Sequence, residues 1–296
     1  MTITHKIPWI GLIICLAELL FSVSAIASDP IFAKGLLWKI ETPGAKPSYI
    51  FGTMHSEDER ITRLPGKVDQ AFQQVSSFTM EVKLDEMLAL DTAAMMTFTD
   101  GKNLKSVAGP KLYSRVASLM TKYGIPEVIL NSLKPWAVFV TLSMPQAKTG
   151  MFLDRVLYSE AKHRGIALYG LETAQEQLTV FDHFSMRDQV RMLQETVDNY
   201  DKFSHLLEQL TQAYLARDLA QMVALNQKYM QIGDRKLADK LMDSLIYERN
   251  LRMVQRMRPR LKDGNAFVAI GALHLPGEKG VLRLLQNRGY TVSVVY

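Results

Sequence analysis

The sequence AFVAIGALHLPGEKG, residues 266–280, begins with an uninterrupted apolar run and then places His274 three residues after a glycine. Such a run between turn residues is typical of a strand buried on both faces, as in a parallel sheet covered by helices. The stretch YIFGTMHSED, residues 49–58, has the same pattern near the other end of the chain and carries His55. The two G-x-x-H units predict buried strands that bring their histidines to one functional site.

Two further strands are expected to end at a carboxylate. The stretch SFTMEV, residues 77–82, contains Glu81, and IALYGLE, residues 166–172, ends at Glu172. The carboxyl ends of parallel strands meet at one edge of a sheet, and α/β proteins bind their ligands there. If all of these strands run parallel, both imidazoles and both carboxylates converge at that edge.

Strand-like stretches at both ends of the chain flank a long helical middle. Residues 36–42 and 290–296 complete the set of expected strands. Residues 173–258 have a polar-amphipathic pattern, for which we expect three or four helices. No flexible linker interrupts the chain. We therefore predict an α/β fold, with α+β as the alternative, in a single domain of residues 28–296. A central mixed sheet is built from the N- and C-terminal parts, and the helical middle forms a cap.

The first 27 residues have the layout of a secretory signal peptide. Lys6 precedes a mostly apolar stretch, residues 7–23, and an A-x-A pattern of small residues ends at Ala27. We expect cleavage after Ala27 and a periplasmic or secreted mature chain without a stable membrane anchor. The alternative is an uncleaved segment that anchors the protein in the membrane, but Glu18 interrupts the apolar run.

Composition and charge exclude several kinds of chemistry. The only cysteine, Cys15, lies in the expected leader, so disulfides, thiol nucleophiles and thiolate metal sites are excluded from the mature chain. The formal net charge is +5, and the densest basic stretch places Arg249, Arg252 and Arg256 on one face of a helix. We expect a solvated face stabilised by the helix dipole rather than a site for an anionic partner. No motif indicates a nucleic-acid partner.

The paired histidines point to metal chemistry. Two imidazoles and one carboxylate, with a position open to water, form a ligand set of hydrolytic zinc, and of iron or manganese with added water. The metal lowers the pKa of its water, and a second carboxylate can accept the proton. Gly52 and Gly271 let the backbone turn sharply or approach a ligand closely. The chain lacks the G-x-S-x-G, H-E-x-x-H, Walker and G-x-G-x-x-G motifs.

Simpler interpretations of these residues stay open. Glu81 is equally well explained as a solvent-facing strand end. Glu172 is equally well explained as the start of the following helix, where the dipole stabilises a carboxylate. His55 and His274 can also be interior residues that bind no ligand.

Several of these stretches, taken in order, resemble the TraB/GumN family, also called TraB/PrgY/GumN. The matching motifs are FGTMHSE, TMEV, YGLETAQEQ, YERN and AFVAIGALHLPGEKGVLRLLQNRGYTV, and the likeness spans residues 35–296. The family is distantly similar to Tiki-type metalloproteases, which carry two G-x-x-H motifs and a glutamate and depend on a divalent metal such as manganese or cobalt. It is also grouped with erythromycin esterases and ChaN-like haem-binding proteins.

The resemblance implies that His55, His274 and Glu81 hold a divalent metal ion, for which manganese, cobalt and zinc are the candidates. We expect Glu172 to act as a base or a further ligand, and Arg249 to stabilise an oxyanion or to pair with a catalytic carboxylate. A purely structural ion pair is an equally good interpretation of Arg249. The remaining positions that match family motifs are Gly52, Gly271 and Asn250.

Two functions follow from this pattern. The first is a periplasmic metal-dependent hydrolase, similar to a metalloprotease, that cleaves a peptide, amide or ester bond in a peptide or small-molecule substrate. The alternative is a non-catalytic binding module that holds haem or a peptide signal, with His55 or His274 as the axial ligand of haem.

Overall fold

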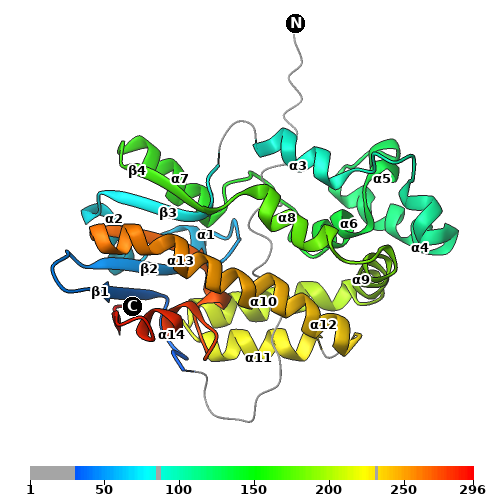
Figure 1. Ribbon diagram of the computed structural model, residues 1–296. Coiled ribbons are helices and arrows are strands. Elements are labelled where there is room, and N and C mark those ends of the chain that lie inside the picture. Colours follow the sequence, from blue (N-terminus) through cyan, green and yellow to red (C-terminus); the bar gives the residue numbers. More distant parts are fainter. Residues whose placement is uncertain (1–30, 85–87, 231–232) are drawn as a thin grey trace, which may run out of the picture. The chain divides into compact units, whose positions relative to one another are not determined.

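The computed structural model describes residues 31–84, 88–230 and 233–296 (Figure 1). The expected signal peptide, residues 1–27, lies outside the described residues.

The described chain forms two compact units, and each is assembled from separate segments of the sequence. We call them the sheet unit and the helical unit. Within the described residues, the sheet unit comprises residues 31–84, 151–173 and 208–296, and the helical unit comprises residues 88–150 and 174–207. The single domain expected for residues 28–296 stays a prediction.

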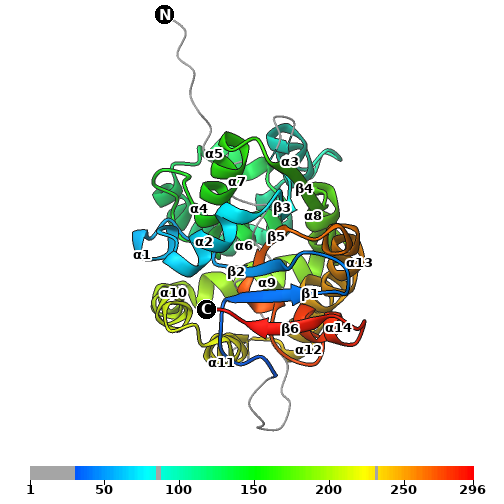
Figure 2. The same cartoon turned by 90° about the vertical axis from the view of Figure 1, so that its left-hand side faces the viewer.

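The sheet unit is built on a six-stranded mixed sheet with the order β4-β3-β5-β2-β1-β6 (Figure 2). Its strands are β1 (Leu37–Glu41), β2 (Ser48–Thr53), β3 (Ser77–Val82), β4 (Ala167–Glu172), β5 (Ala266–Gly271) and β6 (Thr291–Val294). Strands β4, β3, β5 and β2 run parallel to their neighbours, whereas β1 is antiparallel to both β2 and β6. This confirms the α/β class and a mixed sheet built from both ends of the chain, to which β4 adds a strand from the middle.

The helices of the sheet unit follow from amphipathic stretches between the strands. Their bounds are α1 (Glu59–Thr62), α2 (Gly66–Gln74), α7 (Leu153–His163), α11 (Leu219–Met230), α12 (Arg235–Met242), the π-helical η3 (Asp243–Tyr247), α13 (Glu248–Asp263), the 3₁₀ turn η4 (Ala272–His274) and α14 (Val281–Gln286). Helix α10 (Tyr200–Leu215) begins in the helical unit and ends in the sheet unit.

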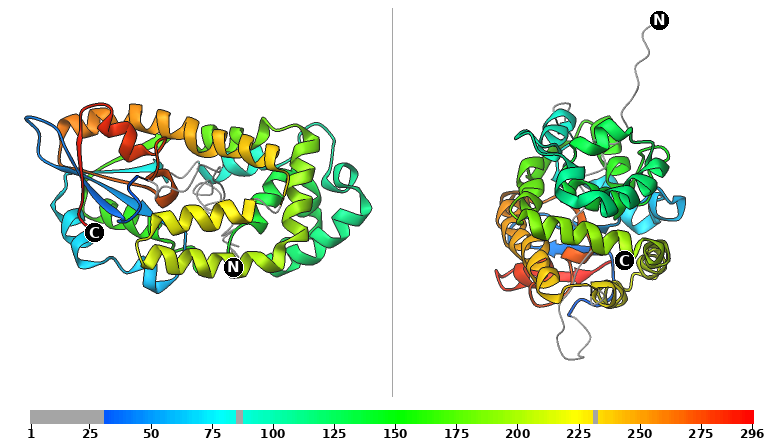
Figure 3. Two further views of the ribbon diagram at one scale, coloured as in Figure 1. Left: turned by 90° about the horizontal axis from the view of Figure 1, so that it is seen from below. Right: turned by 90° about the vertical axis from the view of Figure 1, so that its right-hand side faces the viewer.

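Helices cover both faces of the sheet, so its central strand is buried on both sides. All six residues of β5 are buried, as its continuous apolar sequence predicts. Helices α13 and α14 lie on one face, orange and red in Figure 3. Helix α2 lies on the other face, where Phe72 packs edge-on against Phe267 with ring centroids 5.0 Å apart.

The helical unit has its own apolar core around α6. Its elements are α3 (Leu88–Met96), α4 (Leu104–Met120), η2 (Thr121–Tyr123), α5 (Glu127–Ser132), α6 (Pro135–Leu142), α8 (Ala174–Asp182) and α9 (Met186–Asp198). Every residue of α6 is buried, and Trp136 stacks on Phe181 with ring centroids 5.5 Å apart. None of the helices in the described parts of the chain combines the length and the apolar character needed to cross a membrane.

The expectation of three or four helices after Thr173 is wrong. The described residues form six α-helices there, α8 to α13. Polar side chains divide the stretch, because Ser185 caps the start of α9 and Asp234 caps the start of α12 through hydrogen bonds to backbone N–H groups. An amphipathic pattern that continues across such short breaks conceals them.

Candidate functional site

Four parallel strands carry the predicted site residues to one edge of the sheet unit. The last residues of β2 and β5, Thr53 and Gly271, are partners in the parallel pair, so the chain leaves both strands at the same level. Strand β3 pairs in parallel with both β5 and β4. The predicted side chains at this edge are all buried: His55, Glu81, Glu172 and His274. Glu81, Glu172 and His274 meet around Arg249, and His55 follows the neighbouring strand β2 at the same edge.

The two glycines of the G-x-x-H units serve different purposes. A Cβ atom on Gly52 would lie 2.7 Å from Leu275 Cδ1 and 3.0 Å from Ala272 Cα, so β2 and η4 approach closely only because this residue has no side chain. Gly271 has φ −56° and ψ 139°, a conformation open to other residues, and its N–H donates to Glu81 Oε1 at 2.9 Å. The first glycine permits contact, and the second supplies a backbone donor.

His274 is held by its Nδ1 atom and presents its Nε2 atom to the buried charges. Nδ1 lies 2.6 Å from Asn250 Oδ1, and Asn250 Nδ2 donates to the Lys279 carbonyl at 2.9 Å. Because the amide is oriented this way, Nδ1 is the donor and the lone pair lies on Nε2. Nε2 is 3.8 Å from Glu81 Oε1 and 3.4 Å from Arg249 Nη1. Burial lowers the pKa of His274 to about 4, so the imidazole is neutral near neutral pH.

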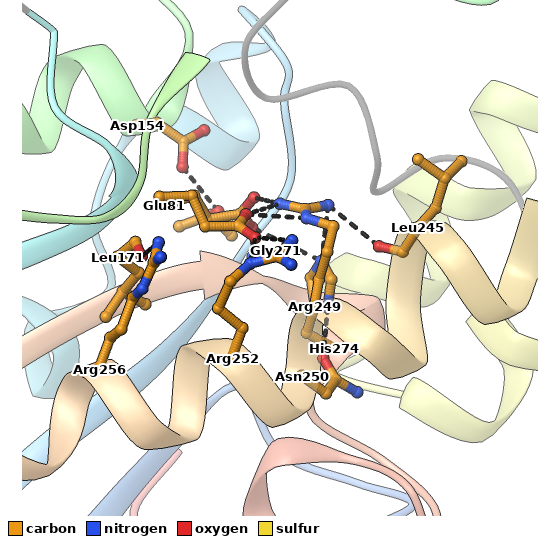
Figure 4. A network of polar contacts seen from close by, with 12 residues as sticks. Glu81, Asp154, Leu171, Leu245, Arg249, Asn250, Arg252, Arg256, Gly271 and His274 are labelled. Carbon is orange, nitrogen blue, oxygen red and sulfur yellow. Dashed lines mark hydrogen bonds and ion pairs between the residues drawn. The ribbon is translucent and has the colours of Figure 1, made fainter. Parts of the chain in front are cut away.

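Arg249 is fully buried and joins two carboxylates, of which Figure 4 labels Glu81. Its Nη2 atom donates to Glu81 Oε2, its Nε atom donates to Glu172 Oε2 at 2.8 Å, and its Nη1 atom donates to the Leu245 carbonyl at 3.1 Å. Arg252 adds two bonds to Glu172 Oε1, at 2.6 and 2.9 Å. Burial by itself lowers the pKa of Arg249, but the charges of Glu172 and Glu81 outweigh this effect and raise it. The guanidinium therefore stays charged.

The structure corrects the expectation of a solvated arginine face on α13 at one position, Arg249. Arg249 has no exposed surface, and Arg256 donates to the Leu171 carbonyl at 2.8 Å. Helix α13 lies against β3, β4 and β5, so Arg249 meets the buried carboxylates, whereas Arg252 is partly exposed and Arg256 is exposed. The interpretation of Glu81 as a solvent-facing strand end is also wrong, because only 2% of its surface is exposed.

Asp154, in the first turn of α7, lies beside His55 and was missed by the sequence reasoning. Thr53 Oγ1 donates to Asp154 Oδ1 at 2.8 Å, and Asp154 Oδ2 lies 3.8 Å from His55 Nδ1. The ring of Phe152 packs on the imidazole of His55, with centroids 3.7 Å apart. The available signal was a charged residue next to the apolar pair Phe152–Leu153, but the segment was interpreted only as an amphipathic helix.

The donor atoms at this edge suit a divalent metal ion. Within the described residues, no group of three or more His, Cys, Asp and Glu side chains is arranged to hold a metal ion, so binding requires side-chain movement. The donor types nevertheless fit: two imidazoles and buried carboxylates are ligands of zinc, manganese and cobalt. His274 is neutral, and a hydrogen-bond acceptor on its far nitrogen is the usual support of a metal-binding histidine.

These features define an α/β protein with a buried cluster of histidine, carboxylate and arginine at the carboxyl ends of parallel strands. The sequence matches the TraB/PrgY/gumN family over residues 36–294. The chain belongs to this family, which confirms the resemblance carried by its motifs.

The relatives include proteins named as metalloproteases. Metalloprotease TIKI2 of Danio rerio is 25% identical over 87% of this chain and 60% of its own length. Metalloprotease TIKI1 of Homo sapiens is 23% identical over 87% of this chain and 61% of its own length. The uncharacterised protein YbaP of Escherichia coli is 22% identical over 83% of this chain and 90% of its own length. This chain thus spans about 60% of the length of the TIKI relatives, and no solved structure gives a significant match.

Proposed function

We propose that this chain is a metal-dependent hydrolase of the metalloprotease-like class, which cleaves a peptide, amide or ester bond. The observation that carries the proposal is the state of His274: it is buried and neutral, Asn250 holds its Nδ1 atom, and its Nε2 atom faces Glu81. His55 leaves the neighbouring parallel strand at the same edge. Relatives named as metalloproteases share this family and support the same class.

His55, His274 and Glu81 are the residues that we assign to a divalent ion, with manganese, cobalt and zinc as candidates. The ion, when bound, supplies a Lewis acid that polarises the scissile carbonyl and lowers the pKa of water. Asn250 fixes the tautomer of His274, so its Nε2 lone pair is available without a proton to lose. Gly271 fixes Glu81 Oε1 through its backbone N–H group.

Glu172 fits a positioning role better than the role of base that the sequence also allowed. Arg249 and Arg252 together donate three hydrogen bonds to its two carboxylate oxygens, at 2.6 to 2.9 Å. Both oxygens of the carboxylate are thus already bound by guanidinium donors. Glu172 therefore holds Arg249 in place, and Arg249 supplies a fixed positive charge next to His274 and Glu81 for a developing oxyanion.

The binding-module alternative gains no support from the surroundings of His55. The cavity that borders His55 has a volume of about 10 Å³ and is lined mainly by apolar side chains of β2, η4 and neighbouring helices. A volume of about 10–15 Å³ is needed for a single water molecule, and haem is far larger. Binding haem at His55 would require a large opening of this part of the sheet unit.

We also propose that the protein acts outside the cytoplasm after cleavage at Ala27. The basis is the leader pattern in residues 1–27, and no described helix is suited to spanning a membrane. Mass spectrometry of the exported protein tests this, because the expected N-terminal residue is Ser28. A chain that retains residues 1–27 and fractionates with membranes would favour the anchored alternative.

Hydrolysis is tested with the mature chain, residues 28–296, purified without a histidine tag and assayed on a library of quenched fluorescent peptides and on simple esters. We expect activity that is lost with a chelator and restored by manganese, cobalt or zinc. His274→Ala should be inactive with its fold intact, whereas His163→Ala, at the exposed end of α7, should match the parent. Activity that survives both chelation and His274→Ala would overturn the proposal.

A further inference from the structure

Asp154 is a buried carboxylate next to His55. It lies in the first turn of α7, is 3% exposed, and is fixed on one side by the hydrogen bond that Thr53 Oγ1 donates to its Oδ1 atom. The backbone also ties this helix start to the loop after β2, since Leu153 N–H donates to the Ser56 carbonyl at 3.2 Å. The carboxylate is thus held next to His55 by two connections.

The remaining polar atoms of this pair are buried without a hydrogen-bond partner. Among the described residues, neither ring nitrogen of His55 has a partner, and neither does Asp154 Oδ2. Buried polar groups in proteins are nearly always satisfied, so these atoms call for a partner such as a water molecule or an ion. An imidazole lone pair and a carboxylate oxygen can both bind one metal cation.

The separation between the two groups agrees with a shared metal ion and not with a hydrogen bond. His55 Nδ1 and Asp154 Oδ2 are 3.8 Å apart, beyond hydrogen-bond range. Two ligand atoms that each lie about 2.1 Å from one metal are about 3.4 Å apart at a tetrahedral angle and farther apart at wider angles. The pair His274 Nε2 and Glu81 Oε1 has the same separation, 3.8 Å.

We propose that Asp154 is a further metal ligand, paired with His55 as Glu81 is paired with His274. This inference rests on the proposed metal-dependent function and extends its ligand set by a carboxylate from α7. Phe152 on the imidazole face and Thr53 on the carboxylate hold the His55–Asp154 pair ready for the ion. Thr53 is then a positioning residue that acts through Asp154.

The test compares the parent with Asp154→Asn, which keeps the size of the side chain and an oxygen that can accept from Thr53. Calorimetric titration with manganese, cobalt and zinc gives the affinities, and the visible absorption of the cobalt form reports the ligands directly. We expect Asp154→Asn to bind at least about 10-fold more weakly and to show an altered cobalt spectrum. Asp69→Asn, which removes an exposed carboxylate on α2, should match the parent.

The outcomes separate this inference from the function on which it rests. Metal binding in the parent with the same affinity and cobalt spectrum in Asp154→Asn would overturn the inference and leave the proposed function standing. A parent that binds no metal would overturn both. If Asp154→Asn does not fold, Thr53→Val tests the inference instead. This variant removes the hydrogen bond that positions the Asp154 carboxylate but keeps the carboxylate itself. We expect about 10-fold weaker binding in Thr53→Val, and unchanged affinity there would count against Asp154.

Discussion

At the scale of single residues, Arg249 places a positive charge in the interior of the sheet unit. It is a fully buried cation whose two carboxylate partners are themselves buried. Its removal would leave Glu81 and Glu172 as buried charges without their principal counter-ion. Breaking a buried ion pair in this way is far more harmful than its formation is favourable.

We therefore expect Arg249→Met to lower the free energy of unfolding by about 3–5 kcal/mol, measured by urea denaturation. Arg115→Met is the matched control, because Arg115 pairs with Asp198 at 2.6 Å but both side chains are about half exposed. That exposed pair should contribute less than about 1 kcal/mol. Equal losses in the two variants would contradict the assignment of Arg249 to a buried network.

Asn250 gives a second prediction at this scale. Asn250→Ala removes the acceptor of His274 Nδ1, so the tautomer with its lone pair on Nε2 is no longer enforced. Loss of such a supporting bond typically weakens metal binding about 10- to 100-fold, which a calorimetric titration measures. Asn287→Ala, at the exposed end of α14, should leave the affinity unchanged. Full affinity in Asn250→Ala would show that His274 does not depend on this bond.

Individual site residues were predictable where they belong to a local sequence pattern, and not where they depend on contacts between distant segments. His55 and His274 were found because the G-x-x-H unit is repeated after two apolar runs, and Glu81 and Glu172 because each ends a short strand. The burial of Arg249 was not predicted, since sequence alone does not show which helix face meets the carboxylates. Asp154 was missed because its partner Thr53 is 101 positions away in the chain.

At the scale of elements, the site depends on how closely strand β2 approaches the turn η4. The contact lies at Gly52, where an added Cβ would meet the backbone of Ala272 and the side chain of Leu275. Leu275 can move, but the backbone of Ala272 can move only together with η4 and His274.

Gly52→Ala is therefore expected to destabilise the protein by about 1–3 kcal/mol and to weaken metal binding by displacing η4. Gly66→Ala is the control, because Gly66 starts α2 with open space around its Cα atom and an ordinary backbone conformation. Alanine there should be neutral or stabilising by up to about 1 kcal/mol. Thermal unfolding and metal titration distinguish the two glycines, and equal behaviour would contradict the close approach.

The strands of this sheet were more predictable than the helices. Short continuous apolar runs indicate buried parallel strands, and the stretches around β2, β3 and β5 were expected on this basis. The stretch around β4 was also expected, although β4 lies at the edge of the sheet and is mostly not buried. The six helices between α8 and α13 were not resolved by the sequence, because capping residues such as Ser185 and Asp234 interrupt an otherwise continuous amphipathic pattern.

At the scale of the whole molecule, metal binding should be linked to stability. An ion that binds only the folded chain stabilises it by mass action, by about 2.7 kcal/mol when the free ion is at 100 times its dissociation constant. We expect the thermal midpoint of the mature chain to rise with added manganese, cobalt or zinc and to fall after chelation. His274→Ala should lose this response. If the thermal midpoint of the parent does not change with added metal, metal binding is not linked to stability.

The central claim is that the two G-x-x-H histidines share one metal ion, and metal content tests it most directly. The mature chain, residues 28–296, is dialysed against manganese, cobalt and zinc, washed, and analysed by mass spectrometry beside His55→Ala, His274→Ala and the control His163→Ala. We expect about one equivalent of metal in the parent and the control, and none in His55→Ala or His274→Ala. Metal that remains in both of those variants, or no metal in the parent, would contradict it.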